Sequence, residues 1–286
     1  MPSLIDIRRR IRSVKNMQQI TKAMKMVSAA KLRRAQERAV ASRPYANMMQ
    51  RVLSNIAAAS VGSDDVAELP LLQVRDEKRI QLIIVSSDTG LAGAFNSNLF
   101  RSAQKFVDDH GGADLRFETI GRKSRDYFRK RSYTVSGEYI GIVEKPKLDQ
   151  AREIAAKMIE AYSKAEIDAV YLIVNEFKSV MAPSLVVKKI LPVELPAEGG
   201  DQIDYIWEQS PKELLSDLLP RYVEMSIYRA LLESLSAYHA ARMTAMDAAS
   251  SNAGDVIQTL TLNLNRVRQA SITREIIEIV SGAAAL

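Results

Sequence analysis

The sequence predicts an α/β domain inserted between two long helices, which come from opposite ends of the chain and pair as an antiparallel coiled coil. Apolar residues recur at the helical period through about the first sixty residues and again through the last stretch. Both stretches contain a zone of small side chains, which permits close approach of a second helix. Between them, short apolar runs alternate with amphipathic segments, as in α/β domains. The predicted parts are residues 1–60, 77–205 and 208–286.

The stretch from about Pro220 to the end of the chain is predicted to be helical throughout, because no proline follows Pro220. Its helical period extends far beyond an ordinary globular helix, through Tyr228, Leu232, Leu235, Val256, Leu260, Leu264, Val267, Ile272, Ile276 and Ile279. At ~1.5 Å per residue it would make a rod of about 100 Å, too long for one compact domain. Gly254 costs about 1 kcal/mol relative to alanine and marks a candidate kink.

The N-terminal stretch repeats this pattern after a start signal at Pro2 and Ser3. Its apolar stripe comprises Leu4, Ile7, Ile11, Val14, Met17, Met24 and Val27. Pro44 is expected to bend the helix. Aligning the two zones of small residues places position ~32 beside ~243 and Leu4 beside ~271. About the last fifteen residues would then extend beyond the partner helix.

This C-terminal overhang is among the most apolar parts of the sequence, and it has two interpretations. Chain ends are commonly frayed and disordered. An exposed apolar patch with helical patterning, however, usually marks an interface. The pattern favours enclosure of the overhang by another subunit.

Composition limits the possible classes of protein. The 286 residues include no cysteine, which excludes disulfides, thiolate metal sites and thiol nucleophiles. There is no uncharged apolar run of ~18 residues to span a bilayer. The basic N-terminus lacks the apolar core of a signal peptide, so it is interpreted as mature structure and a cytoplasmic location is the default expectation.

The net charge of +6 is unevenly distributed. Residues 1–51 contain thirteen Lys and Arg against Asp6 and Glu37, a balance of +11, so the remainder carries −5. Such a basic helical face suits nucleic acid, anionic lipid or an acidic protein surface, or is simply solvated. Because residues 1–40 contain no aromatic residue and no nucleic-acid-reading motif, an acidic protein partner is favoured over nucleic acid.

The middle of the chain is predicted to be a Rossmann-like α/β domain with a mostly parallel sheet. Strands are expected in RIQLIIVSS, LRFETIG, YTVSGEYIG, DAVYLIVNEFK and SLVVKKILP. Helices are expected through Leu99 and Phe106, in RKSRDYFRKR and in KLDQAREIAAKMIEAYSKA. Residues 192–210 are expected to form a loop or edge hairpin leading to the last helix.

Two glycine-bearing motifs raise the alternative of a phosphate-binding enzyme. DTGLAGA (residues 88–94) lies between a strand and a helix but has two glycines where a dinucleotide fingerprint has three. GRKS (residues 121–124) resembles the end of a phosphate loop, but Arg116 stands where the first glycine is required. Tight turns explain both motifs. Neither His110 nor His239 has ligand partners at helical spacing, so no catalytic, cofactor-binding or metal residue is predicted.

Three strings go beyond periodicity: RQASITREIIEIVSGAAA (268–285), IRRRIRSVKNMQQITKAMKMVSAAK (7–31) and SSDTGLAGAFN (86–96). They closely resemble the gamma subunits of F-type ATP synthases, and the resemblance extends in order over essentially the whole chain. It implies a non-catalytic rotor whose terminal helices form a shaft inside a ring of three alpha and three beta subunits. The α/β domain would meet the epsilon subunit and the c-ring. Proton flow would turn the shaft and drive ATP synthesis or hydrolysis at the beta subunits.

The resemblance also implies roles for particular residues. Met24 matches a shaft position near an acidic loop of the beta subunits, and Arg242 matches a shaft residue near Met24. Rotor–stator contacts are further implied for Arg268, Gln269, Thr273, Glu275 and Glu278, and an apolar bearing for Ile276, Ile279 and Val280. No cofactor and no nucleic acid is implied.

The implied location is the bacterial cytoplasmic membrane, peripheral through the c-ring on the cytoplasmic side, with the matrix side of the mitochondrial inner membrane as the alternative. Because the chain has no cysteine-bearing insertion, thiol control as in the chloroplast branch is excluded. The rival hypotheses are a nucleotide- or phosphate-binding enzyme, resting on DTGLAGA, and a coiled-coil scaffold or nucleic-acid-binding protein, resting on the basic helix.

Overall fold

The computed structural model describes residues 3–59, 66, 68–131, 133–177, 179, 183–195 and 209–284. The chain forms two compact units. We call Met1–Ala29 with Arg242–Leu286 the terminal unit, and Ala30–Ala241 the domain unit. Helices α1 (Leu4–Ala59) and α6 (Pro211–Ala284) contribute residues to both. The segment expected to be a loop or hairpin lies largely outside the described residues, which omit 196–208.

Both long helices begin with a reciprocal side-chain cap. The Ser3 hydroxyl accepts from the Asp6 amide at 3.2 Å, and Asp6 Oδ2 accepts from the Ser3 hydroxyl at 2.9 Å. At α6, Ser210 and Glu213 form a capping box: each accepts a hydrogen bond from the other's backbone amide, at 3.3 and 3.1 Å. Such caps satisfy amides that have no intrahelical acceptor. They fix where each helix starts.

Neither internal proline ends its helix. The helical hydrogen-bonding pattern of α1 continues through Pro44, and α6 begins nine residues before Pro220 and continues past it. Gly254 is likewise helical. The cost of these residues is therefore offset by the packing of the helices, because tertiary burial supplies most helical stability in proteins.

In the terminal unit, buried and half-buried positions recur every seven residues on both helices. On α1 they are Ile7, Val14, Thr21 and Ser28, with Ile11, Gln18 and Lys25 between them. On α6 they are Met246, Ala253, Leu260 and Val267, with Ser250, Ile257, Leu264 and Ser271 between them. A sustained seven-residue period is the signature of a left-handed coiled coil. The predicted antiparallel pairing is confirmed in this unit by Lys25 bound to Asp247 and Gln18 to Ser250.

The sequence-based apolar stripe is partly wrong. Met17, Val27 and Val256 are exposed, whereas the small polar residues Thr21 and Ser28 are buried in the seam. Thr21 satisfies its hydroxyl by donating to the Gln18 carbonyl oxygen at 3.0 Å, so its burial leaves no unpaired donor. Small side chains let the backbones of the two helices approach closely. Which side chains are buried in the seam then depends on their size and shape more than on their hydropathy.

The domain unit contains a five-stranded sheet in the order β3-β2-β1-β4-β5. Four strands are parallel and β5 is antiparallel to β4, as expected for a mostly parallel sheet. The strands are β1 (Arg79–Val85), β2 (Asp114–Ile120), β3 (Val135–Tyr139), β4 (Ala169–Phe177) and β5 (Pro183–Leu191). The connecting helices are α3 (Phe95–Asp109), α4 (Arg122–Arg129) and α5 (Leu148–Ser163), and Pro70–Leu72 forms the short helix η1.

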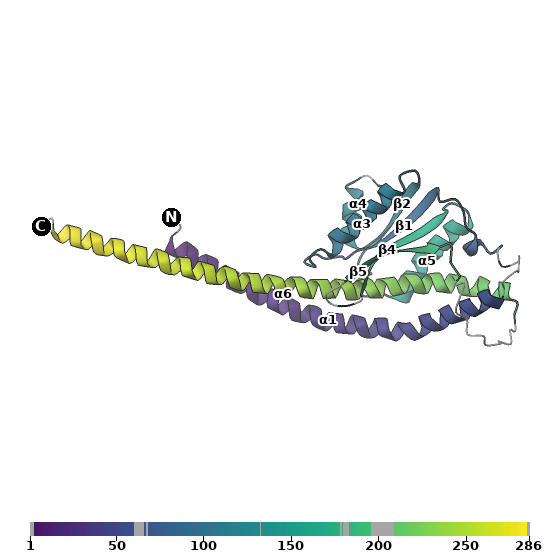
Figure 1. The fold of residues 1–286 in the computed structure, drawn as a ribbon, viewed down its shortest axis with the longest axis horizontal. Helices are drawn as coiled ribbons and strands as arrows, with labels where there is room; N and C mark the ends of the chain where they lie inside the picture. Colours follow the sequence, from purple (N-terminus) through teal and green to yellow (C-terminus); the bar gives the residue numbers. More distant parts are fainter. Residues whose placement is uncertain are drawn as a thin grey trace. The chain divides into compact units, whose positions relative to one another are not determined.

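The two faces of the sheet have separate cores. Helices α3 and α4 cover one face, where Leu99, Phe117 and Phe128 are buried together. On the other face, α5 packs with the domain-unit parts of α1 and α6 (Figure 1). Residues 230–240 of α6 are buried on every side, because α6 packs both against α1 and against the α/β domain.

A buried ion pair lies inside the α/β domain. The Glu118 side chain is fully buried, and its Oε1 accepts from Lys157 Nζ at 2.7 Å while its Oε2 accepts from Gln81 Nε2 at 3.1 Å. Gly137 leaves room for it, since a Cβ there would lie 1.9 Å from Glu118 Oε1. A buried charge is tolerated only when it is paired and hydrogen-bonded.

We expect Lys157→Met to destabilise the chain. Breaking a buried ion pair by removing one partner costs about 3–5 kcal/mol. Because the Lys157 side chain is 42% exposed, water replaces part of the lost interaction, and we expect a loss of about 2 kcal/mol in the free energy of unfolding. Urea denaturation followed by circular dichroism measures it. Lys164→Met is the matched control, because the Lys164–Glu160 pair is exposed on both sides; an equal loss there would contradict this assignment.

Candidate functional site

The end of α6 is an exposed apolar surface. From Ile272 to Ala283 every described side chain is exposed, and the seam of the terminal unit ends at Ser271. The bearing residues of the sequence analysis, Ile276, Ile279 and Val280, are 54%, 71% and 62% exposed. The overhang predicted beyond about position 271 is therefore present, and it is helical. Large apolar side chains gathered on an exposed helix usually mark an interface.

The polar candidates lie on the same segment of α6. Arg268, Gln269, Thr273, Glu275 and Glu278 are all exposed there, so their polar groups face solvent. One local contact involves them, in which the Ser271 hydroxyl donates to Glu275 Oε1 at 3.3 Å. Charged and amide groups therefore alternate with apolar ones around this end of α6.

The other two candidates, Met24 and Arg242, are both half-buried in the terminal unit. Beside Met24, Lys25 Nζ lies 2.6 Å from Asp247 Oδ1, and Gln18 Nε2 donates to the Ser250 carbonyl at 3.2 Å. The alignment from the sequence places Lys25 beside ~250 and Gln18 beside ~257, so the observed contacts lie three and seven residues earlier on α6. Sequence reasoning missed the Lys25–Asp247 pair, although opposite charges on the two small-residue zones were a usable signal.

Helix α1 has a second apolar face in the terminal unit. Met17, Ile20, Met26 and Val27 are 56–61% exposed, and they are flanked by basic residues such as Lys22. The spacing of 17, 20 and 27 is that of one helix face. This face does not pack on α6, so α1 presents both an apolar stripe and positive charge outward.

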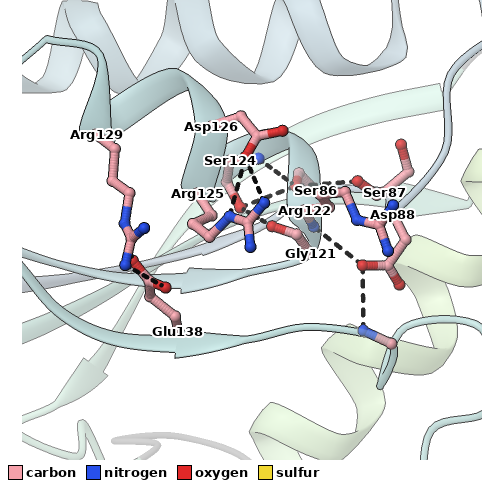
Figure 2. Close-up of polar contacts among 11 residues, drawn as sticks. Ser86, Ser87, Asp88, Gly121, Arg122, Ser124, Arg125, Asp126, Arg129 and Glu138 are labelled. Atoms are coloured by element: carbon pink, nitrogen blue, oxygen red, sulfur yellow. Dashed lines mark hydrogen bonds and ion pairs between the residues drawn. The ribbon is translucent and has the colours of Figure 1, made fainter.

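The loop at the carboxyl end of β1 is the place where a phosphate-binding enzyme of this fold would bind its ligand. In this chain the first amides of α4 are already occupied by oxygens of the protein (Figure 2). The Arg122 amide donates to Asp88 Oδ1 at 3.0 Å, and the Ser124 amide donates to Ser86 Oγ at 2.8 Å. Between them, the Lys123 amide donates to the Ser87 carbonyl at 3.1 Å. Asp88 therefore sits where an anionic ligand would bind.

Gly121 permits this close contact. Its φ is 96°, and a Cβ there would lie 2.4 Å from the Ser86 carbonyl oxygen. The basic side chains of α4 are also partly engaged, since Arg125 pairs with Asp126 at 2.7 Å and Arg129 with Glu138 at 2.6 Å. The Arg125 guanidinium lowers the pKa of the Asp126 carboxyl. Both glycine-bearing motifs thus build tight turns closed by internal hydrogen bonds.

The two histidines occupy structural positions. The ring of His110 stacks on Phe106 with centroids 4.1 Å apart, and its Nδ1 lies 2.8 Å from the Phe106 carbonyl oxygen. His239 is buried within α6. Among the described residues, no group of three or more His, Cys, Asp or Glu is placed to hold a metal ion. Over the same part of the chain, no helix is both long enough and apolar enough to cross a membrane.

These observations define a class of protein: two long terminal helices that pair as a coiled coil, an α/β domain inserted between them in the sequence, and an exposed apolar surface at the end of α6. The family model described as "ATP synthase" matches residues 3–286. The chain is 60% identical over 285 residues to the "ATP synthase gamma chain" of Solibacter usitatus, covering 100% of this chain and 99% of that one. The chain belongs to the family of ATP synthase gamma chains.

Two solved structures share the fold. A chain in the structure described as "Euglena gracilis mitochondrial ATP synthase, rotor, rotational state 1" matches with a TM-score of 0.64 at 17% identity, covering 94% of this chain and 98% of that one. One in "Euglena gracilis mitochondrial ATP synthase, OSCP/F1/c-ring, rotational state 3" matches with a TM-score of 0.67 at 17% identity, covering 99% and 94%. The predicted fold class, two long terminal helices with an inserted α/β domain, is confirmed.

We expect Asp88→Ala to destabilise the α/β domain by about 1–2 kcal/mol, because it leaves the Arg122 and Gly141 amides without their acceptor. Thermal unfolding of the full chain measures this. Asp88→Asn keeps one accepting oxygen and should lose less. If the alanine variant instead matches the parent chain in stability and gains saturable binding of inorganic phosphate, Asp88 is blocking a ligand site and not closing a turn.

Proposed function

We propose that this chain is the central shaft of a rotary ATP synthase, and that it transmits rotation between a membrane-embedded ring and three catalytic sites on other subunits. The observation that carries this proposal is the exposed apolar end of α6, from Ile272 onward, in a chain of the gamma family. An isolated protein would leave these apolar side chains exposed to water, whereas a shaft enclosed by other subunits would bury them. The chain itself has no catalytic site in this proposal, which agrees with the internally closed loop at Asp88.

The partners follow from the same role. Three alpha and three beta subunits would enclose the paired helices, and the epsilon subunit and c-ring would meet the α/β domain. The functional parts would be residues 1–60 and 208–286 as the shaft and 77–205 as the domain. The c-ring would attach the chain peripherally to the cytoplasmic face of a bacterial membrane, with protons as the coupling ion.

Two kinds of contact at the end of α6 would have different tasks. Ile276, Ile279 and Val280 would form a bearing, because burial and dispersion have no preferred direction and allow turning in every orientation. Torque requires contacts that form in one orientation and break in another, as charge-assisted hydrogen bonds do. Arg268 and Gln269, with Thr273, Glu275 and Glu278, would supply these contacts.

The outward face of α1 supports the same arrangement. Its exposed apolar residues suit a loose fit inside the ring, and its positive charge suits an acidic loop of the beta subunits. Met24 would lie near that loop, and Arg242 would lie near Met24. The uneven charge of +11 over residues 1–51 then belongs to a protein–protein contact and not to nucleic acid.

The direct test of the function is assembly and rotation. The chain is mixed with alpha and beta subunits of its own enzyme, and a bead is attached to the α/β domain. We expect unidirectional steps on addition of ATP. Absence of rotation in a correctly assembled complex would contradict the proposal. Calorimetry of the chain alone with ATP should give no saturable heat, because the shaft has no nucleotide site.

We expect the two kinds of contact to separate under mutation. Ile276, Ile279 and Val280 changed together to alanine keep an apolar helix, so rotation should persist with some loss of assembly stability. Changing Arg268 and Gln269 to alanine removes directional contacts that are together worth about 1.4 kcal/mol, so ATP synthesis should fall about tenfold while the complex still assembles. Synthesis rates and gel filtration of both complexes provide the comparison. Normal synthesis in the double variant alongside failure of the triple one would reverse the assignment.

Replacing Met24 by lysine should lower coupling more than assembly. Met24 is half-buried at the surface of the terminal unit, where an added ammonium would pair with the acidic loop in one orientation. A pair worth about 1 kcal/mol slows exit from that orientation about fivefold.

The measurement is proton pumping per ATP hydrolysed in reconstituted vesicles. Met48→Lys is the matched control, because Met48 is 56% exposed on the same helix but lies in the domain unit. Equal ratios in the two variants would count against a special role for Met24.

A further inference from the structure

The DTGLAGA loop of residues 88–94 contacts α6 within the domain unit. The hydroxyls of Thr89 and Tyr238 are 2.6 Å apart, and the Tyr238 hydroxyl also reaches the Gly90 carbonyl oxygen at 3.4 Å. Both distances are satisfied when Thr89 donates to Tyr238 and Tyr238 donates to Gly90. The rings of Tyr238 and Phe95 pack in a T-shaped arrangement with centroids 5.7 Å apart. Tyr238 is only 3% exposed, so water does not compete for these bonds.

A second strand end contacts α6 nearby. The Phe177 amide, at the end of β4, donates to Glu233 Oε2 at 3.2 Å. Glu233 is buried, and its other oxygen lies 4.0 Å from Arg229 Nε. Strands β1 and β4 are neighbours in the sheet. Glu233 and Tyr238, five residues apart on α6, therefore hydrogen-bond to the chain at the carboxyl ends of two adjacent strands.

The loop that holds Tyr238 is itself firmly fixed. Asp88 Oδ1 accepts from the amides of Arg122 and Gly141, which tie the loop to the ends of β2 and β3. The Ser87 hydroxyl donates to the Thr89 carbonyl at 2.7 Å. Leu91 adopts a φ of 63°, an unusual conformation for leucine that persists only where its surroundings enforce it. Thr89 is thus presented to α6 by a loop with little freedom to yield.

We propose that Thr89 and Tyr238 form a clasp that fixes the angular position of the α/β domain about α6, so that torque passes between them without slip. This inference rests on the proposed shaft function. The remaining contact between the domain and α6 is largely apolar, through residues such as Leu219, Val223 and Ile227. Apolar burial holds surfaces together but resists sliding weakly, because it has no preferred direction. The clasp and the Glu233 contact supply the buried directional part, beside the partly exposed ion pair of Arg152 with Glu224 at 3.4 Å. Tyr238 and Thr89 are positioning residues.

The test uses three variants that preserve shape. Tyr238→Phe removes one hydroxyl and keeps the ring on Phe95, Thr89→Val removes the other, and Thr89→Ser keeps a hydroxyl and should restore the behaviour of the parent chain. Tyr45→Phe is the matched control, because Tyr45 is 49% exposed and is not in the clasp. Unaltered circular dichroism spectra establish that each variant is folded.

The first measurement is hydrogen exchange of the amides of residues 88–94 in the full chain. Losing one buried hydrogen bond should speed their exchange about 2- to 10-fold in Tyr238→Phe and in Thr89→Val. The double variant should add nothing further if the two hydroxyls act through each other. Unchanged exchange in both single variants overturns the clasp.

The second measurement is proton pumping per ATP hydrolysed in the assembled enzyme, working against a proton gradient. We expect a lower ratio in Tyr238→Phe and Thr89→Val, and the parent ratio in Thr89→Ser and Tyr45→Phe. Faster amide exchange of the loop, with an unchanged number of protons pumped per ATP hydrolysed, would show that the contact is only structural and would overturn the inference. Failure of the parent complex to pump would instead overturn the proposed function, so the two failures are distinguishable.

Discussion

The rest of the structure depends on the pairing of α1 with α6. Neither helix buries its apolar residues by itself, and in the terminal unit each seam position of one helix is covered only by the other. Pairing residues more than two hundred positions apart costs chain entropy that no local contact recovers. The seven-residue period extends this burial over seven seam residues on α1 and eight on α6, and the Lys25–Asp247 pair is compatible with this register.

Much of this architecture can be predicted from the sequence, because periodicity and turn residues are local signals. The strands, their alternation with helices, the overhang and the capped start at Ser3 all follow from patterns within a few residues. The face of α1 that turns inward could not be predicted in the same way. Met17 and Val27 belong to an apolar stripe, yet they face outward, while Thr21 and Ser28 are buried. A helix with two apolar faces has two acceptable orientations from its own sequence, and only its partner's shape selects one.

The role of the DTGLAGA loop also depended on distant atoms. Its sequence favours an ordinary tight turn over a phosphate-binding turn, but both need small residues after a buried strand, so the sequence does not show which atoms close the loop. The acceptors that close it come from Ser86 and Asp88, but the donors lie at residues 122, 124 and 141, which only the folded sheet brings together. Tyr238 cannot be singled out from the sequence for a related reason: it is one of three tyrosines in α6, and its partners Thr89 and Gly90 are distant in the chain.

In the function proposed here, the chemistry of each contact follows from the motion it must permit. The end of α6 turns against its surroundings, so its large side chains are isoleucine and valine, whose burial is insensitive to angle. The polar groups from Arg268 to Glu278 are exposed, because contacts that form and break repeatedly must exchange with water at low cost. The contact of α6 with the α/β domain must not turn at all, and there the hydroxyls of Thr89 and Tyr238 meet away from water, where a hydrogen bond is strong and costly to break. In this function, the contacts that must break during rotation are exposed to water, and the contact that must persist is buried.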